Sequence, residues 1–274
     1  MTSDAAEHLA EDLHEIAIDL AGGAAELVRA RSRGPLDIAS KSSETDLVTQ
    51  VDRDTERWLV DAISRSRPGD SILGEEGGAR EGSTAVRWLI DPIDGTVNFV
   101  LGIPFYGVSV AAEVDGVVVA GAVVNPVSGE SFHARLGAGA WLGDQRLPGP
   151  RDVPLERAVI GTGFGYSAAL RARQVAVVAE LLPRVSDIRR IGASSLEWCY
   201  VAAGRLDGYF EAALNPWDYA AGALIAAESG CVVGGLRGEP ISALLGVAAG
   251  ARLAPELFGA LESIGAAEVN RSAS

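Results

Sequence analysis

The chain has 274 residues, of which 48% are hydrophobic and 22% charged, the composition of a folded globular protein rather than a disordered one. Its 23 basic and 37 acidic side chains give a net charge of −14, which argues against sequence-independent nucleic-acid binding because the phosphate backbone would be repelled. An anionic substrate would therefore need an intervening cation, and a bound metal ion is the obvious candidate.

The first half is predicted to begin with two helices. Apolar residues at three- and four-residue steps predict a helix over 4–31, which Gly34-Pro35 ends, and another over 52–67. Strands are predicted over 71–73, 87–90, 105–114, 117–125 and 131–136. Asp115-Gly116 is a two-residue hairpin signal between two of these strands.

A stretch rich in glycine and proline over 137–156 separates the two halves. We therefore expect an N-terminal α+β half over 1–145 and a C-terminal α/β half over 146–274, together forming one catalytic unit. In the second half the predicted elements alternate: strands over 159–161, 187–190, 206–211 and 231–233, and helices over 167–182, 194–203, 217–229 and 255–264. This pattern predicts stacked layers of helix and sheet.

Cys199 and Cys231 lie far apart in apolar segments, so we expect buried free thiols rather than a disulfide or a thiolate zinc site. The acidic N-terminus lacks the basic and apolar regions of a secretion signal. No uncharged apolar run reaches the ~18 residues of a membrane span. We expect a soluble, cytoplasmic protein that binds neither membranes nor nucleic acid.

The segment WLIDPIDGTVNF at 88–99 concentrates the chemistry. Asp91 ends a predicted strand and Asp94 follows three residues later, so both carboxylates can converge on one cation. Pro92 stiffens the turn and helps to aim the Ile93 carbonyl at the same point. Hard oxygen ligands of this kind suit Mg²⁺ rather than zinc. The alternative is an ordinary Asp-Pro/Asp-Gly turn that caps a helix.

Further carboxylates and amides accompany this segment. Gly95 permits close approach of the backbone, and the amides of Gly95 and Thr96 can face a phosphate oxygen. Glu75-Glu76 follows a strand and can offer one ligand inward, although it is equally typical of a solvated acidic loop. Asp218 lies in the first turn of an apolar helix, where a carboxylate is also favoured by the helix dipole alone.

Other charged residues allow two interpretations each. Asp46 and Asp52 either bind a water near a metal or cap the second helix. Lys41 offsets phosphate charge or is simply exposed, and Glu211 ends a strand either as a site residue or as a surface charge. The scattered histidines, His8, His14 and His133, argue against zinc, and we expect the first two to be exposed.

Rival enzyme classes lack their signatures. Two residues separate Asp91 and Asp94, which is the wrong spacing for the D-x-D pair of aspartyl-phosphate phosphatases. Gly107–Ala111 fails the G-x-S-x-G pattern of serine hydrolases at its last position. No P-loop is present, and the glycine-rich segment 161–165 does not fit a dinucleotide-binding loop.

Taken together, these segments resemble the inositol monophosphatase family of metal-dependent phosphatases. The resemblance holds in order and spacing over roughly residues 10–265. The matching segments are KSSxxDLVTxxD at 41–52, GEE at 74–76, WLIDPIDGTxNF at 88–99, PFxxxS at 104–109, GAxxNP at 121–126, GxGA at 137–140, 192–195 and WDYAAG at 217–222. Val97, Leu101 and Ala193-Ser194 depart from the family pattern without touching a metal ligand, which leaves substrate choice open.

The resemblance implies an α/β fold, the five-layered αβαβα sandwich of the inositol monophosphatase and fructose-1,6-bisphosphatase type. Its first sheet is expected to be antiparallel and its second mixed. By resemblance, Glu75, Asp91 and the Ile93 carbonyl hold one Mg²⁺, while Asp91, Asp94 and Asp218 hold a second. A third, looser ion involves Glu75, and Mn²⁺ can replace Mg²⁺. A homodimer and inhibition by Li⁺ are also expected.

Roles in catalysis and substrate binding follow from the same resemblance. Thr96, with Glu75 and Asp46 nearby, orients and deprotonates the attacking water. The amides of Gly95 and Thr96 bind phosphate, and Ser194 and Glu211 touch substrate hydroxyls. The full set expected to contact substrate is Lys41, Gly95, Thr96, Ser194, Glu211 and Asp218.

The expected reaction is Mg²⁺-dependent hydrolysis of inositol 1-phosphate to myo-inositol and phosphate, by direct attack of a metal-activated water. Histidinol phosphate is the first alternative, because the Glu211 carboxylate suits either a hydroxyl or an ammonium group. Fructose 1,6-bisphosphate and 3′-phosphoadenosine 5′-phosphate rank lower. A different class of function is a non-catalytic scaffold that binds RNA polymerase or another partner, but the complete ligand set favours catalysis.

Overall fold

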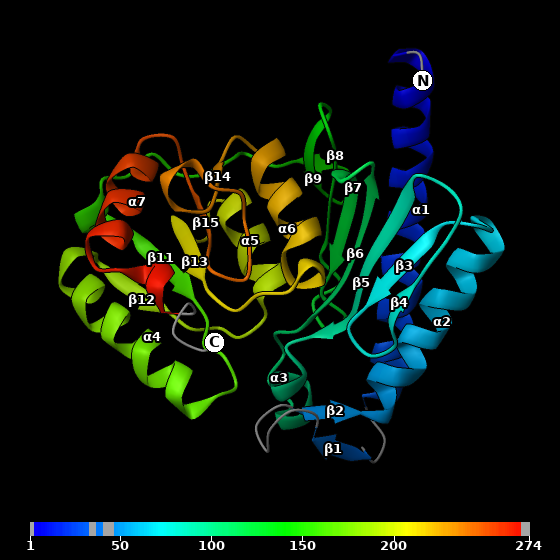
Figure 1. Cartoon of the computed structure of the whole chain (residues 1–274), viewed down its shortest axis with the longest axis horizontal. Helices are drawn as coiled ribbons and strands as arrows, with labels where there is room; N and C mark the ends of the chain where they lie inside the picture. Colours follow the sequence, from blue (N-terminus) through cyan, green and yellow to red (C-terminus); the bar gives the residue numbers. More distant parts are fainter. Residues whose placement is uncertain (1–2, 33–36, 41–46, 270–274) are drawn as a thin grey trace.

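Three layers of helices alternate with two β-sheets in the computed structural model, which describes residues 3–32, 37–40 and 47–269 (Figure 1). The long helices are α1 (Ser3–Arg31), α2 (Gln50–Ser66), α4 (Ala168–Leu181), α5 (Ser194–Ala202), α6 (Pro216–Glu228) and α7 (Leu253–Ser263). Helices α1 and α2 cover one sheet, α5 and α6 lie between the sheets, and α4 and α7 cover the other sheet. The predicted αβαβα sandwich is therefore confirmed.

The first sheet has eight strands in the order β10-β9-β8-β7-β6-β5-β3-β4. Its strands are β3 (Ser71–Gly74), β4 (Gly78–Arg80), β5 (Val86–Asp94), β6 (Gly107–Val114), β7 (Val117–Val124), β8 (Ser131–Arg135), β9 (Gly139–Leu142) and β10 (Gln145–Arg146). The β3–β5 pair is parallel and the others are antiparallel, so the sheet is mixed rather than purely antiparallel as expected. The parallel pair arises because the β4 hairpin occupies the sheet edge and the chain then returns beside β3.

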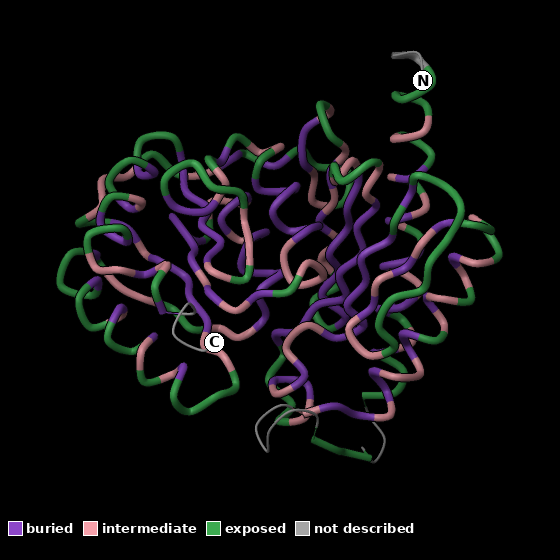
Figure 2. The backbone as a smooth tube through the Cα atoms, in the orientation of Figure 1, coloured by how far each residue is buried: buried purple, intermediate pink, exposed green. Residues whose placement is uncertain are grey.

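The second sheet has five strands in the order β12-β11-β13-β15-β14. Its strands are β11 (Val159–Thr162), β12 (Asp187–Arg189), β13 (Gly208–Glu211), β14 (Val232–Gly234) and β15 (Gly246–Ala249). The β11 pairings with β12 and β13 are parallel and the β15 pairings are antiparallel, as predicted for a mixed sheet. The central strands of both sheets form the buried interior of the molecule, whereas edge strands such as β4 and β10 are exposed (Figure 2).

Small residues allow the middle helices to pack tightly between the sheets. A Cβ at Gly121 of β7 would lie 2.9 Å from the Cα of Ala221 in α6, and a Cβ at Gly222 would lie 2.7 Å from the Cβ of Trp198 in α5. Only glycine fits such close contacts of main chain with main chain. The close fit of α5 and α6 matters for function because the N-termini of both helices carry predicted site residues.

The short elements were the ones that sequence patterns missed. They are β1 (Ile38–Ser40), β2 (Leu47–Thr49), β4, β9, β10, β15 and α3 (Thr96–Leu101). Segments this short carry too few residues for an apolar period to be visible. Within the described residues no helix is long and apolar enough to cross a membrane.

The strand expected over 87–90 continues to Asp94. Asp91 pairs with Ser109 and Asp94 pairs with Gly107, so β5 holds one more residue than β6 between the two pairs. Such a bulge bends a strand locally and re-aims its side chains and carbonyls. It is the feature that places Asp91, the Ile93 carbonyl and Asp94 close together.

Candidate active site

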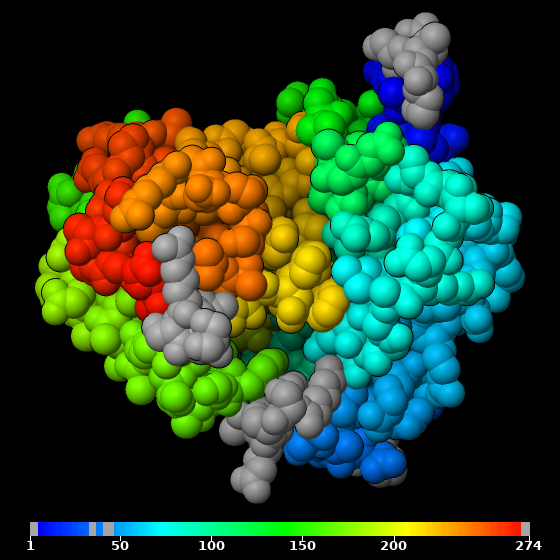
Figure 3. Space-filling model, viewed as in Figure 1, coloured from blue at the N-terminus to red at the C-terminus, as the bar shows by residue number. Residues whose placement is uncertain are grey.

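The predicted site residues that the structure describes gather around one cavity of about 360 Å³. Its wall combines the turn after β3, the end of β5, the end of β13 and the first turns of α5 and α6, so both halves of the chain contribute. Figure 3 shows this face of the molecule hollowed between the halves, beside the segment that leads into α6.

Asp91 lies beneath the cavity wall at the β5 bulge. Its side chain is only 1% exposed, and the amide of Ile93 donates to its Oδ1 atom at 3.0 Å. Burial raises the pKa of Asp91 well above its usual range, and the negative charges of Glu75, Asp94 and Asp218 raise it further. The four carboxylates therefore lie close enough for their charges to act on one another.

Asp94 is held by the first turn of α5. Both the amide and the hydroxyl of Ser195 donate to its Oδ2 atom, each at 2.6 Å. Burial raises the pKa of Asp94, while these hydrogen bonds oppose the shift by stabilising the charged form. The contact connects the β5 ligand segment with the second half of the chain.

Asp218 both caps α6 and faces the other carboxylates. Pro216 begins the helix, and the Asn215 amide donates to Asp218 Oδ2 at 2.7 Å within a capping box. Burial, followed by the charge of Asp94, raises its pKa well above the usual range. The two interpretations of this residue are thus compatible, because one oxygen accepts from the cap and the carboxylate still lines the cavity.

Glu75 reaches the cavity from the turn between β3 and β4. The turn is anchored by Glu56 of α2, which is 4% exposed and which no sequence pattern identified. The Glu76 amide donates to Glu56 at 2.7 Å, and the Gly77 amide also donates to it. A buried carboxylate therefore fixes the backbone immediately after Glu75.

Thr96 contacts Asp52, the carboxylate that begins α2. The Thr96 hydroxyl lies 3.1 Å from Asp52 Oδ1 and 3.0 Å from the Ile93 carbonyl oxygen. Asp52 also caps α2 by accepting from the Thr49 amide at 2.9 Å, so the capping role considered for it is confirmed, while a role near a bound metal stays a prediction. Burial raises the pKa of Asp52. Asp46 and Lys41, which the sequence placed nearby, lie outside the described residues.

Gly95 lies where the backbone closes around the site. Its φ is 92°, and a Cβ would lie 2.9 Å from the Gly192 carbonyl oxygen and 3.1 Å from the Ala193 Cβ. Any other residue would therefore be strained in conformation and would also clash with the segment before α5. This explains the glycine that the D-P-I-D-G-T pattern contains.

The far wall of the cavity carries Glu211 and Ser194. Tyr209 places its hydroxyl 3.0 Å from Ser194 Oγ and also contacts Glu211 Oε2. Burial raises the pKa of Glu211 to about 7, with the Tyr209 hydrogen bond opposing the shift. Arg190 lines the same cavity.

The donor set fits a hard divalent cation. Four neighbouring carboxylates and a carbonyl oxygen offer the ligands that Mg²⁺ prefers. Burial, and then the charges of neighbouring carboxylates, raise the pKa values of Asp91 and Asp218, and a bound cation would offset that repulsion. In the part of the chain that the structure describes, no group of three or more His, Cys, Asp or Glu side chains is already arranged to hold a metal ion.

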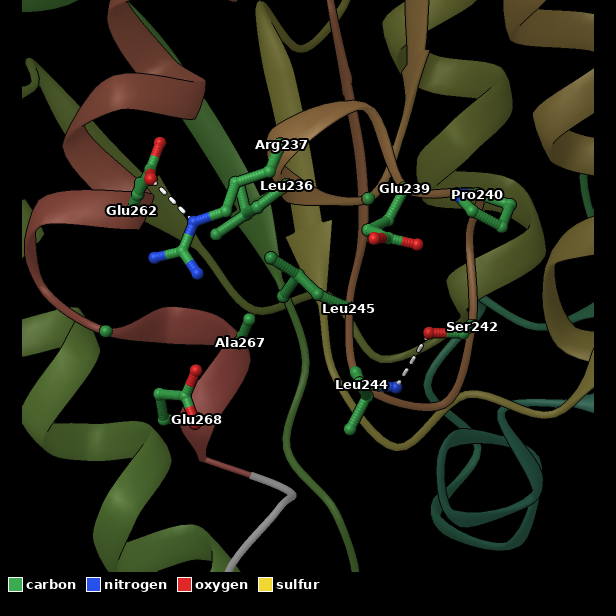
Figure 4. Close-up of a pocket in the computed structure, with 12 residues that line it drawn as sticks. Leu236, Arg237, Glu239, Pro240, Ser242, Leu244, Leu245, Glu262, Ala267 and Glu268 are labelled. Atoms are coloured by element: carbon green, nitrogen blue, oxygen red, sulfur yellow. Dashed lines mark hydrogen bonds and ion pairs between the residues drawn. The ribbon is translucent and has the colours of Figure 1, made fainter.

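Two features outside this cavity were not expected. His14 is half-buried rather than exposed, with its Nε2 atom 3.0 Å from His133 Nδ1, because α1 packs on β8. A second cavity of about 300 Å³ lies in the C-terminal half, over Leu236 and Leu245 and beside the Arg237–Glu262 ion pair (Figure 4). Neither was identified from the sequence.

Comparison with known proteins identifies the family and the fold. The model of the inositol monophosphatase family matches residues 9–266. The chain is 48% identical to the inositol-1-monophosphatase of Mycobacterium leprae, covering 92% of this chain and 94% of the relative. It is 40% identical to the Nus factor SuhB of Escherichia coli K12, covering 73% and 76%.

A solved structure agrees with these relatives. Mycobacterium tuberculosis SuhB superposes with a TM-score of 0.80 at 43% identity, covering 94% of this chain and 98% of that one. The match spans both halves of the sandwich and hence every element that lines the cavity. The chain therefore belongs to the inositol monophosphatase family of metal-dependent phosphatases.

Proposed function

We propose that this phosphatase hydrolyses inositol 1-phosphate to myo-inositol and phosphate, with Mg²⁺ as its metal. The observation that carries the proposal is the cluster of Glu75, Asp91, Asp94 and Asp218, whose charges act on one another beside the cavity. The name of the Mycobacterium leprae relative supports the choice of substrate.

The resemblance to the family implies two metal positions. Glu75, Asp91 and the Ile93 carbonyl would hold one Mg²⁺, and Asp91, Asp94 and Asp218 a second, with a looser third ion at Glu75. When bound, Mg²⁺ neutralises phosphoryl oxygens, lowers the pKa of a water ligand and stabilises the leaving alkoxide. Mn²⁺ has the same ligand preferences and can replace it.

Thr96 is placed to receive a proton from the attacking water. Its own hydroxyl proton lies between two acceptors, Asp52 and the Ile93 carbonyl. The Thr96 oxygen can therefore accept from the water while the Thr96 proton moves toward Asp52. Glu75 shares the task of orienting the water. By resemblance, Asp46 also helps to orient the attacking water. The contact with Thr96 that supports such a role is made by Asp52.

The remaining contacts hold the substrate. The amides of Gly95 and Thr96 bind phosphate, and Lys41 offsets its charge. Ser194, Glu211 and Asp218 contact the leaving polyol. Arg190 lines the same cavity as Glu211. Its positive charge would repel a substrate ammonium group but not a neutral hydroxyl. This favours inositol 1-phosphate over histidinol phosphate, which remains the first alternative.

A non-catalytic scaffold is the second candidate function, because one relative is named a Nus factor. Loss of a metal ligand would be expected in a protein with that role alone. Glu75, Asp91, Asp94, Thr96 and Asp218 are all present in this chain. We therefore place catalysis first, and we carry over a homodimer, cytoplasmic location and Li⁺ inhibition from the family.

The deciding experiment measures phosphate release from inositol 1-phosphate and histidinol phosphate on one preparation. Turnover in millimolar Mg²⁺ should exceed turnover in chelator, with inositol 1-phosphate preferred. Asp218→Asn should abolish release while leaving circular dichroism unchanged, since the amide keeps the size of the carboxylate. Preference for histidinol phosphate would overturn the substrate, and a fully active Asp218→Asn enzyme would overturn the metal site.

A further inference from the structure

One phenol connects the two residues that face the substrate polyol. The Tyr209 hydroxyl, on β13, lies 3.0 Å from Ser194 Oγ at the start of α5 and also contacts Glu211 Oε2 at the end of its own strand. Tyr209 itself is fully buried and does not line the cavity, whereas Ser194 and Glu211 both do.

The phenol is held rigidly. Its ring packs edge-on against Trp198 with centroids 5.1 Å apart, and both side chains are fully buried. The Glu211 carboxylate lies against Gly163, where a Cβ would come within 2.1 Å of both carboxylate oxygens. Neither group can move far without disturbing β11, β13 or α5.

The number of protons fixes the direction of these hydrogen bonds. A phenol has one proton, and the Glu211 carboxylate, which is ionised at a pH above its pKa of about 7, can only accept. The Tyr209 proton is therefore donated to Glu211, and the Ser194 hydroxyl donates its own proton to the Tyr209 oxygen. Ser194 then has only lone pairs for the cavity, and Glu211 has its Oε1 oxygen, which is also an acceptor.

We propose that Tyr209 is a positioning residue that makes this wall of the cavity accept hydrogen bonds only, so that substrates must present two hydroxyl donors there. The proposal rests on the proposed function, because it assigns the wall to the leaving polyol. It selects polyol phosphates over monoesters whose alcohol part is apolar or carries only acceptors. A buried acceptor left without a donor disfavours the wrong substrate.

The test compares Tyr209→Phe with the wild type on two substrates in Mg²⁺ at about pH 8, where Glu211, with its pKa of about 7, is ionised. Inositol 1-phosphate presents hydroxyls, and p-nitrophenyl phosphate presents none. The variant keeps the ring and removes only the hydroxyl. Without this hydroxyl, Ser194 and Glu211 each lose their hydrogen bond to the phenol, and the Ser194 proton can point into the cavity. The kcat/KM for inositol 1-phosphate should therefore fall about tenfold, mainly through KM, as expected for one misplaced hydrogen bond. The value for p-nitrophenyl phosphate should stay within about twofold.

Two further variants separate this role from a loss of folding. Tyr200→Phe removes a phenolic hydroxyl from a residue that does not line the cavity, and its substrate preference should be unchanged. Ser194→Ala should reduce preference for inositol 1-phosphate as Tyr209→Phe does. The double variant should be little worse than either, because both act through one hydrogen-bond chain.

The outcomes are distinguishable from those of the proposed function. If the wild type releases phosphate from both substrates but Tyr209→Phe slows them equally, or slows neither, the positioning role is wrong and the phosphatase assignment stands. If the wild type releases phosphate from neither, the proposed substrate fails first. An unchanged Mg²⁺ affinity of Tyr209→Phe, measured by calorimetry, is expected, and a weakened affinity would contradict a role confined to the polyol wall.

Discussion

The carboxylate of Glu56 occupies the space that a side chain at Gly77 would need. A Cβ on Gly77 would lie 2.6 Å from Glu56 Oε1, and a Cβ on Gly74 would lie 2.7 Å from the same carboxylate. These glycines flank Glu75-Glu76, and Glu56 accepts from the amides of Glu76 and Gly77. The turn that presents Glu75 is thus fixed by a carboxylate from another element.

We expect Gly77→Ala to destabilise the protein by about 1–3 kcal/mol, because the methyl group displaces Glu56 from a well-packed position. It should also weaken Mg²⁺ binding, since Glu75 loses its fixed backbone. Thermal unfolding in chelator and a calorimetric Mg²⁺ titration measure the two effects. The matched control is Gly22→Ala in α1, where a Cβ would have no atom within 4 Å. This variant should be slightly more stable than the wild type. Equal melting temperatures for the two variants would contradict the packing argument.

Mg²⁺ should stabilise the folded protein most at high pH. The pKa of Asp91 is raised by burial and by Glu75, Asp94 and Asp218. A carboxyl group with a higher pKa in the folded state favours folding while protonated, and this contribution is lost as the pH rises. The metal-free protein should therefore lose stability as the pH rises from the ordinary aspartate pKa of about 4 toward alkaline values, and Mg²⁺ should restore it by binding the folded state alone.

Thermal unfolding in chelator and in millimolar Mg²⁺ across that pH range checks this prediction. Asp91→Asn keeps the shape and removes the charge, so it should show a flatter pH profile, a smaller Mg²⁺ effect and no turnover. Identical melting temperatures of the wild type with and without Mg²⁺ at the upper end of the range would count against the site.

The position of the carboxylate segment at the end of β5 could be predicted because its signal is local. Asp91, Asp94 and Gly95 lie within five residues, and the proline and glycine between and after them restrict the backbone in known ways. The long helices were likewise predicted from apolar spacing. The bulge that extends β5 to Asp94 could not be, because it depends on pairing with Ser109 and Gly107.

The supporting residues escaped prediction for the same physical reason. Glu56 precedes the turn it anchors by 20 residues, and His14 precedes His133 by 119. A charged residue inside an amphipathic helix looks identical in sequence whether it faces water or a buried turn. Tyr209 is an ordinary strand residue until the fold brings Ser194 beside it. Only tertiary packing distinguishes these cases.

Glu211 should make stability fall with rising pH. Its pKa of about 7 in the fold lies above the usual 4.5, mainly because of burial. Folding is favoured by this group below the unfolded value, and the contribution disappears as the pH rises through the folded one, at a cost of up to about 3 kcal/mol. Glu211→Gln should therefore be more stable than the wild type at about pH 8 and similar at about pH 5. A stability difference that is independent of pH would show that another group is responsible.

His14 should have the opposite effect. The Gly143 carbonyl can only accept, so His133 donates to it from Nε2 at 3.0 Å and must accept from His14 through Nδ1. Burial, with the charges of His133 and Arg135, lowers the pKa of His14 to about 4. The neutral pair stabilises the fold above the unfolded pKa, and this contribution is lost as the pH falls toward the folded value.

His14→Gln should accordingly be less stable than the wild type at about pH 7, where the pair is neutral, and the deficit should shrink toward about pH 4. Glutamine can still donate to His133 but lacks the ring that packs against it at a centroid distance of 5.0 Å. His8→Gln, on the same helix, is the control for a substitution on α1. Chemical unfolding at several pH values measures both variants. Because neither His14 nor His133 lines the cavity, turnover at neutral pH should be unaffected, and a pH-dependent stability deficit without loss of activity would separate this contact from the catalytic site.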